Sequence, residues 1–320
     1  SAAARAAQRS FDAEVLAVRQ EVANAYWKLW LIHEEHRLKN EHDIVLETLA
    51  GTVRGRVRTG AASLADLNQV ELGIARHHDH HGEHREQERV ATAELLRAIG
   101  AEQPRESLPI SDTPVEGLPA QSDETLHQAA SRNPRVQSAE LMATASDSIA
   151  RVEAAERAPS LHTGLDWIVT GDAPAPVQDS GQDAVAVTAG LSVPLWGRSY
   201  KDAVGAAEAE AAAHRAERDA LLQRVDAELE KSIAAVRDAQ RRIELYRYTL
   251  IPQAETSFRS VLGSYQTGRT AVASALLAQR DLLELQLELA RSRARHALAW
   301  AELERVEGQQ VEGTQRGEQP

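Results

Sequence analysis

A long stretch without a helix-breaking residue constrains the fold of this chain more than any other feature. The first proline is Pro104, and nothing in residues 10–58 would end an α-helix. At about 1.5 Å per residue, this segment would form a rod of roughly 70 Å. A break at 59–63 follows, and then a second helix that ends at Gly100, a residue typical of helix C-caps. The first hundred residues therefore predict a long antiparallel helical hairpin.

The same hairpin occurs twice in the sequence. An offset of 208 residues pairs Gly60 with Gly268 without a gap. Other identical residues at this offset are Glu47 and Glu255, Thr48 and Thr256, Val53 and Val261, Gly55 and Gly263, Thr59 and Thr267, and Gly100 and Gly308. A repeat of this length indicates a duplicated hairpin rather than a short solenoid unit. We expect the second copy over residues 199–266 and 270–306, with a kink or interruption at Pro252.

The last helix has apolar residues on two sides. Leu282, Leu285 and Leu289 share one side, whereas Leu276, Leu283 and Leu287 share another. Such a helix has neighbours on both sides, which is typical of a helix in the wall of a helical layer or barrel. The fold class predicted is therefore mainly α, with duplicated long antiparallel hairpins.

Two segments between the hairpins change from helical to alternating periodicity. Leu161–Val169 and Val185–Val193 alternate apolar with polar or small residues, which predicts two strands with one apolar face. Each has the length of a membrane β-strand. We expect an antiparallel β-hairpin whose residues Leu165, Trp167, Val187 and Leu191 point outward to lipid. The alternative is a hairpin packed on a soluble domain.

Composition excludes several classes of protein. The chain has no cysteine, so neither disulfides nor thiolate chemistry is available. Its net charge of -12 argues against nucleic-acid binding. No nucleophile with a base, paired carboxylate site or phosphate loop emerges, so we expect neither an enzyme nor a bound cofactor. Residues 1–10 lack the apolar core of a signal peptide, and no segment has the roughly 18 apolar residues of a spanning helix.

Five regions follow from these patterns. They are a first helical hairpin at 1–100, a proline-rich linker with short helices at 101–158, a β-hairpin at 159–197, a second helical hairpin at 198–308, and a disordered tail at 309–320. A soluble long-helix scaffold that bridges partners without a pore remains the alternative. It accounts for the helices but not for the strands or the repeat.

The ordered motifs resemble the outer membrane factors, of which TolC is the best-known member. The resemblance covers nearly the whole chain and rests on motifs in a fixed order. These are Asn133-Pro134, Pro159-Ser160-Leu161, Leu191-Ser192-Val193-Pro194-Leu195-Trp196-Gly197, Ile251-Pro252-Gln253-Ala254-Glu255, Ser264-Tyr265-Gln266-Thr267-Gly268, Ala278-Gln279 and Leu303-Glu304-Arg305-Val306-Glu307-Gly308. By the repeat offset, residue 1 corresponds to the region just after Tyr200, so we expect a further β-hairpin to precede the first repeat.

The resemblance implies an architecture, a location and partners. Three copies would close a β-barrel in the bacterial outer membrane and an α-barrel across the periplasm, so the implied assembly is a homotrimer in contact with outer-membrane lipid. The implied function is export of small molecules or metal ions passed on by an inner-membrane transporter and a periplasmic adaptor protein.

The resemblance also places functional residues at the two turns between the long helices, which would form the periplasmic tips. These are Thr59, Gly60, Ala61, Ser63, Thr267, Gly268, Arg269 and Thr270. There it implies adaptor contact and the aperture of the channel. The alternative is a pair of ordinary turn glycines, because tight turns often need a positive φ.

Two further sites are hypotheses. The family often has acidic residues six and nine positions after the second tip glycine, where this chain has Ser274 and Leu277, but the first repeat has Asp66 at the sixth position. Asp66 from three protomers, with Ser274, could form a pore ring that binds cations. The alternative is an acidic residue favoured at a helix N-terminus.

A histidine-rich run interrupts the second helix of the first hairpin. His77, His81 and His84 fall at i, i+4 and i+7, on one helical face. Imidazoles at that spacing can share a divalent metal ion. The alternative is a solvated helix face.

Overall fold

The structure of the protein is a computed structural model. It describes residues 2–101, 110, 113–156, 158–169, 183–193 and 197–308, without the side chains of residues 77, 78, 80, 81 and 197–199. The expected tail at 309–320 and the loop at 171–182 lie outside these residues. The chain divides into two compact units. One holds Ser1–Ser10 and Arg135–Leu222, and the other holds Phe11–Pro134 and Gln223–Pro320.

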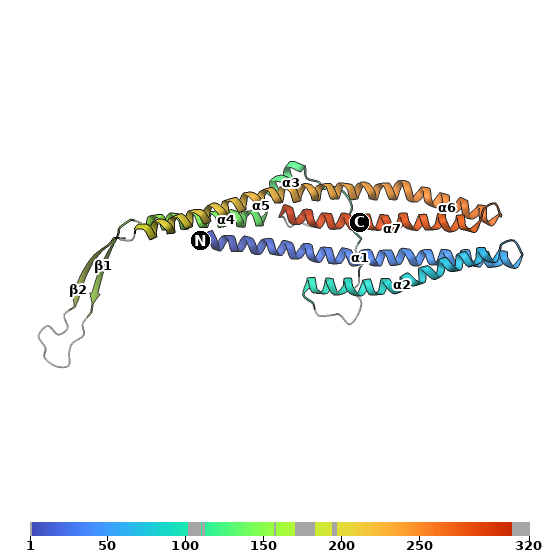
Figure 1. Cartoon of the computed structure of the whole chain (residues 1–320), viewed down its shortest axis with the longest axis horizontal. Coiled ribbons are helices and arrows are strands. Elements are labelled where there is room, and N and C mark those ends of the chain that lie inside the picture. The colour runs from blue at the N-terminus through green and yellow to red at the C-terminus, as the bar shows by residue number, and fades with distance from the viewer. Residues whose placement is uncertain are drawn as a thin grey trace, which may run out of the picture. The chain divides into compact units, whose positions relative to one another are not determined.

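The first helical hairpin, most of which belongs to the second unit, consists of α1 (Ala2–Arg58) and α2 (Leu64–Ile99), as Figure 1 shows. Helix α1 starts eight residues earlier than the expected bound, because residues 2–9 contain no helix breaker. Gly100 ends α2 in the left-handed conformation, with φ 67°, as the sequence predicts. Leu29 of α1 packs against Ala91 and Leu95 of α2 in a buried cluster.

The second hairpin consists of α5 (Gly197–Leu245), a π-helical turn η1 (Tyr246–Leu250), α6 (Ile251–Gln266) and α7 (Val272–Glu307). The predicted interruption near Pro252 is confirmed, and it takes the form of the π-helical turn. Ile251 donates its backbone N–H to the carbonyl of Tyr246, five residues back. Because proline has no N–H to donate, one wider turn before it accommodates the missing hydrogen bond.

The linker docks on this π-helical turn and on α7. Glu116 accepts hydrogen bonds from Arg247 of η1, at 2.5 and 2.6 Å, and from Arg293 of α7, at 2.9 Å. Burial raises the pKa of Glu116, but the hydrogen bond and charge of Arg247, with those of Arg293, outweigh burial and lower it. Nε2 of His296 donates to the carbonyl of Gly117 at 2.8 Å. The π-helical turn therefore carries the arginine that holds the linker.

Helices α3 (Asp123–Ala130) and α4 (Pro134–Ala155) follow the linker; α3 is short, as expected, but α4 has 22 residues. The side-chain amide of Asn133, just before α4, donates to the last carbonyls of α7, at 2.9 Å for Arg305 and 2.8 Å for Val306. Gly308 ends α7 with φ 72°, and an added Cβ there would lie 2.7 Å from Cδ of Pro134. Asn133, Pro134 and Gly308, although far apart in sequence, therefore pack together at the C-terminal end of α7.

Strands β1 (Ser160–Ile168) and β2 (Ala184–Ser192), both in the first unit, pair antiparallel. The predicted pairing is confirmed, although both strands start and end one residue earlier than expected. The register sets Leu165 opposite Val187 and Leu161 opposite Leu191, so the apolar residues share one face, which is exposed. That this face meets lipid stays a prediction.

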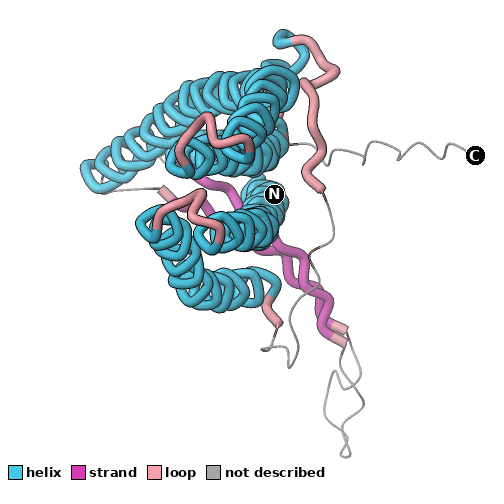
Figure 2. The backbone as a smooth tube through the Cα atoms, turned by 90° about the vertical axis from the view of Figure 1, so that its right-hand side faces the viewer, coloured by secondary structure: helices cyan, strands magenta, loops and turns pink. Residues whose placement is uncertain are grey.

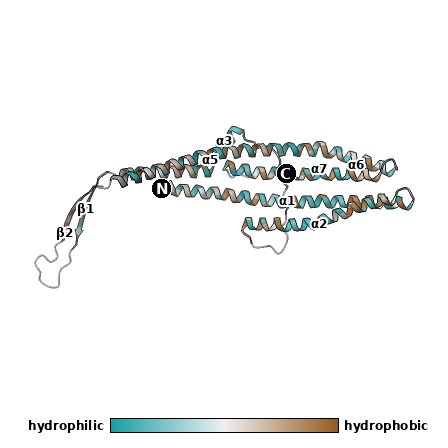
Figure 3. Cartoon of the chain, in the orientation of Figure 1, coloured by the Kyte–Doolittle hydropathy of each residue, from teal (hydrophilic) through white to brown (hydrophobic). Residues whose placement is uncertain are grey.

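The helices are amphipathic rather than continuously apolar. Figure 3 shows polar and apolar residues mixed along each of them. Among the described residues, no helix is long and apolar enough to cross a bilayer.

Candidate functional site at the hairpin turns

The two turns between the long helices have the same backbone geometry. In the first, Gly60 has φ 70° and donates to the carbonyl of Val57 at 3.0 Å, and Ala61 donates to Arg56 at 2.8 Å. In the second, Gly268 has φ 74°. It donates to Tyr265 at 2.9 Å, and the next residue, Arg269, donates to Ser264 at 2.9 Å. All these pairs obey the 208-residue offset, so the repeat read from the sequence is also a repeat of hydrogen bonds.

Arg56 joins the two turns. Its Nη1 donates to the carbonyls of Tyr265, at 2.5 Å, and Gln266, at 3.0 Å, while its Nη2 donates to the carbonyl of Ala61 at 3.2 Å. The guanidinium also lies 4.9 Å from the centre of the Tyr265 ring, which adds a cation–π attraction. Figure 2, which looks onto this end of the molecule, shows the turns next to one another. The sequence-predicted residues of both turns are thus brought together into one surface.

A hydrophobic cluster supports this surface from below. It is formed by residues of four helices: Leu49, Ala50, Val53, Val70, Tyr265, Val272 and Ala275. Burial raises the pKa of Tyr265, and its hydroxyl has no hydrogen-bond partner among the described residues. The turns therefore rest on a shared core and do not project as independent loops.

The eight predicted tip residues are exposed. Arg269 makes no side-chain hydrogen bond or ion pair with another described residue, whereas the threonines bond locally, as Thr59 does to the carbonyl of Arg56 at 3.0 Å. Sequence reasoning missed Arg56 and Tyr265. The only sequence signal for Tyr265 is its place in the Ser264–Gly268 motif, and no local pattern marks Arg56.

Asp66 serves as a helix cap. Its carboxylate accepts hydrogen bonds from the backbone N–H of Ser63 at 2.9 Å and from the Ser63 hydroxyl at 2.8 Å, while the Ser63 side chain accepts from the N–H of Asp66. These bonds, the backbone one first, lower the pKa of Asp66. The helix-terminus interpretation thus has direct support. Ser274 is exposed, and a pore ring of these two residues stays a prediction.

The histidine run is not simply a solvated face, as the alternative interpretation expected. His84 is buried, and its Nε2 lies 2.7 Å from Nζ of Lys39, with the ring of His36 5.6 Å away. Burial, then the positive charge of Lys39, lowers the pKa of His84. The side chains of His77 and His81 lie outside the described residues, and no cluster of three metal-ligating side chains occurs within them. Metal binding by this run stays a prediction.

Comparison with known proteins gives these features a family. The model of the outer membrane efflux protein family matches residues 125–309, more than half of the chain. The chain therefore belongs to the outer membrane efflux protein family, and it is an efflux-channel protein of the outer membrane that extends into the periplasm. This family consists of channel proteins rather than enzymes, and membership argues against the soluble scaffold.

Solved structures share the fold. The outer-membrane channel OprN matches at 16% identity and a TM-score of 0.78, covering 96% of this chain and 69% of that one. The outer membrane protein VceC of Vibrio cholerae matches at 19% identity and a TM-score of 0.76, over 96% and 73%. The outer membrane channel MtrE of Neisseria gonorrhoeae matches at 18% identity and a TM-score of 0.73, over 96% and 71%. A sequence comparison with proteins of curated function finds no match.

Proposed function

We propose that this chain is the channel subunit of a tripartite efflux system and that its paired turns dock onto a periplasmic adaptor, which links it to an inner-membrane transporter. The observation that carries the proposal is the Arg56 contact. Because one guanidinium binds carbonyls of both turns, the six turns of a trimer would form three preassembled docking units instead of six separate loops. A preorganised surface loses less entropy when a partner binds.

The chemistry of this surface suits a protein partner. The exposed residues are small or polar, so a partner's backbone can approach closely. Arg269, whose guanidinium is not bonded to any other described residue, offers donors that match a carboxylate or a backbone carbonyl of the adaptor. The carbonyls of Ala61, Tyr265 and Gln266 are already engaged by Arg56, so we expect exposed side chains such as that of Arg269 to make the polar contacts with the adaptor.

We also propose that the chain assembles as a homotrimer through an uncovered stripe on α1. Phe11, Val15 and Val18 are spaced i, i+4 and i+7, and they are 64%, 38% and 43% exposed. A helical apolar stripe needs a covering partner. Replacing Phe11 and Val18 by Glu should convert trimers to monomers in analytical ultracentrifugation. Trimers that persist would exclude this stripe as the interface.

Export assays test the docking role. Gly268→Trp and Arg269→Glu should abolish drug or metal resistance of cells that depend on this channel. Trimer levels in the outer membrane should be nearly unchanged, because the turns bury little apolar surface and the backbone strain of an L-residue at Gly268 costs only about 1 kcal/mol. Arg259→Glu, a matched charge reversal at an exposed position of α6, is the control and should export normally. Full resistance in cells that carry both tip changes would show that the turns have no docking role.

A further inference from the structure

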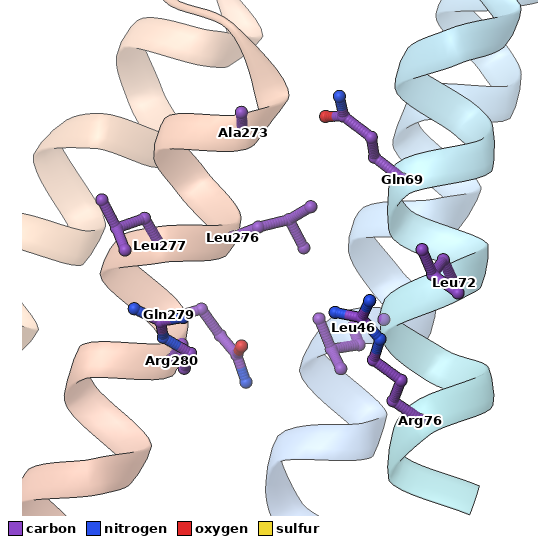
Figure 4. A pocket seen from close by; sticks show the side chains of 10 residues that line it. Leu46, Gln69, Leu72, Arg76, Ala273, Leu276, Leu277, Gln279 and Arg280 are labelled. Atoms are coloured by element: carbon purple, nitrogen blue, oxygen red, sulfur yellow. The ribbon is translucent and has the colours of Figure 1, made fainter.

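A pocket of about 430 Å³ opens between the two hairpins, close to the turns. Figure 4 shows its two walls, with residues of α2 on one side and residues of α7 on the other. Leu46 of α1, which is only 2% exposed, contributes to the lining. The volume lies in the range of small-molecule sites, roughly 300–1,000 Å³. A space of this kind between packed helices is a candidate site for a ligand.

The middle of the pocket is apolar. Leu276 points into the gap from α7, and Leu72 lies on the facing wall. Leu72 and Leu277 are 52% and 51% exposed although they line a hollow. A ligand that covers these exposed leucine side chains would be stabilised by about 25 cal/mol for each Å² of apolar surface removed from water.

One end of the pocket is cationic. Figure 4 shows Arg76 on the α2 wall and Arg280 on the α7 wall at the same end, away from Gln69 and Ala273. Arg76 makes no hydrogen bond or ion pair with another described residue. Arg280 has only a 4.0 Å contact with the neighbouring Asp281, and both of these side chains are well exposed, so this contact contributes little. Two arginines without strong partners, in a chain of net charge -12, form a local site for negative charge.

We propose that this pocket binds an amphiphilic organic anion, with its acidic group at the end where Arg76 and Arg280 lie and its apolar body along Leu72 and Leu276. The Arg76 guanidinium, which extends into the gap in Figure 4, can donate charge-assisted hydrogen bonds to a carboxylate or sulfonate, and the positive charge of Arg280 at the same end adds to the attraction. The walls run from Gln69 to Arg76 and from Ala273 to Arg280, which is about 10 Å along each helix. An apolar body of one or two fused rings, or a chain of eight to ten carbons, fills that length. A cation or a neutral amphiphile would lack a partner at the charged end.

A matched pair of fluorescent probes tests the site on the purified full chain. The anionic probe is 8-anilinonaphthalene-1-sulfonate, and N-phenyl-1-naphthylamine has the same rings without the sulfonate. The wild-type chain should bind the sulfonate at least tenfold more tightly. Arg76→Gln with Arg280→Gln should remove that preference while leaving the affinity for the neutral probe within twofold. A matched double variant at exposed arginines elsewhere, Arg89→Gln with Arg259→Gln, should keep the preference.

A third variant shows where the probes bind. Leu72→Trp fills the pocket from an exposed position, so it should weaken both probes, and far-UV circular dichroism should confirm unchanged helicity. Equal affinities of the wild-type chain for the two probes, or a preference that survives in the Arg76→Gln/Arg280→Gln variant, would overturn the proposal. Unchanged binding in Leu72→Trp would overturn it too, because the probes would then bind elsewhere. None of these measurements depends on export, so the docking role of the turns stands or falls separately.

Discussion

The two hairpin turns have the same backbone conformation but differ in the side chains that stabilise them. Ser63 and Asp66 form a reciprocal capping box at the start of α2. The repeat offset places Ala271 and Ser274 at the equivalent positions of α7, whose N-cap has no side-chain hydrogen bond. The hydroxyls of Thr267 and Thr270 donate to carbonyls within the second turn, and Arg56 of the first hairpin donates to two more of its carbonyls. Duplication has therefore kept the turn itself, while the capping box and the arginine that joins the two turns both lie in the first copy.

This asymmetry predicts that the second turn depends on the first, but not the reverse. The offset places Ser264 at the position equivalent to Arg56, and serine is too short to reach across to the first turn. The second turn should thus open more readily whenever the first hairpin is altered. Each of the following changes tests this dependence, from the largest expected effect to the smallest.

Arg56→Gln should have the largest effect. It removes charge-assisted bonds to two carbonyls of the second turn and one of the first. At about 2 kcal/mol for hydrogen bonds from a charged group, amide hydrogen exchange in residues 267–270 should accelerate by roughly 30-fold, and in residues 59–62 by much less. Arg54→Gln, which removes an exposed ion pair with Glu71, is the control and should change neither. Equal acceleration in both turns would contradict the asymmetry.

Gly268→Ala should destabilise the chain more than Gly60→Ala. Both glycines have a positive φ, so each substitution costs about 1 kcal/mol for an L-residue in the left-handed region. At Gly268 the new Cβ would also lie 3.3 Å from Nη2 of Arg56, whereas nothing lies within 4 Å of a Cβ at Gly60. Urea denaturation of the two variants measures the difference. Identical denaturation midpoints would show that the Arg56 side chain moves away from the new Cβ without loss of stability.

Ser63→Ala should destabilise only the first turn. Loss of an N-cap side chain costs about 1 kcal/mol, and amide hydrogen exchange should be faster in the N-terminal residues of α2. Exchange at the start of α7 should be unaffected, because Arg56 still holds the second turn. Ser274→Ala, a Ser→Ala change at an exposed position without a cap, serves as the control and should be neutral. A response at the start of α7 in Ser63→Ala would mean that the turns are coupled in both directions.

Low pH should affect the first turn and not the second, because only the first has a carboxylate cap. Hydrogen bonds from Ser63 lower the pKa of Asp66 below its ordinary 3.8, so the folded state favours the ionised carboxylate. The stabilisation from this cap is present above the ordinary pKa and is lost as pH falls through the lowered one. The amide resonance of Ser63 should therefore shift on acidification below about pH 4, while that of Ala271 should not. A parallel shift of both amides would point to general acid unfolding.

The sequence predicted the turns but not the contact that joins them. Gly60 and Gly268 could be predicted as left-handed turn residues because each lies in a short motif with its sequence neighbours, and the 208-residue repeat pairs the two motifs. The hydrogen bonds of Arg56 connect residues more than 200 positions apart. No periodicity or spacing reports them, since they depend on how one hairpin lies against the other.

Two further residues carried two interpretations each in the sequence. Asp66 follows Ser63 at the spacing of a capping box, and the structure contains that box, while the pore ring stays a prediction. His84 was expected in a metal site or on a solvated face. Tertiary packing against Lys39 buries its side chain, so the solvated face is wrong for His84, while metal binding stays a prediction. Pro252 predicted an interruption but not its form, because a kink and a π-helical turn both accommodate a missing N–H.

Ala271→Ser is the smallest change and the most direct test of the comparison. Ala271 has φ -76° and ψ 154°, close to the φ -91° and ψ 160° of Ser63, so its backbone is already that of an N-cap. A serine there should stabilise the start of α7 by about 0.5–1 kcal/mol, and Ala273→Ser, inside the helix, should not. In the Arg56→Gln background the new cap should restore part of the protection lost from the second turn, because the turn would then have a side-chain cap of its own. Stabilisation without any rescue would mean that Arg56 acts only by holding the hairpins together, and the missing cap would no longer explain the dependence of the second turn on the first.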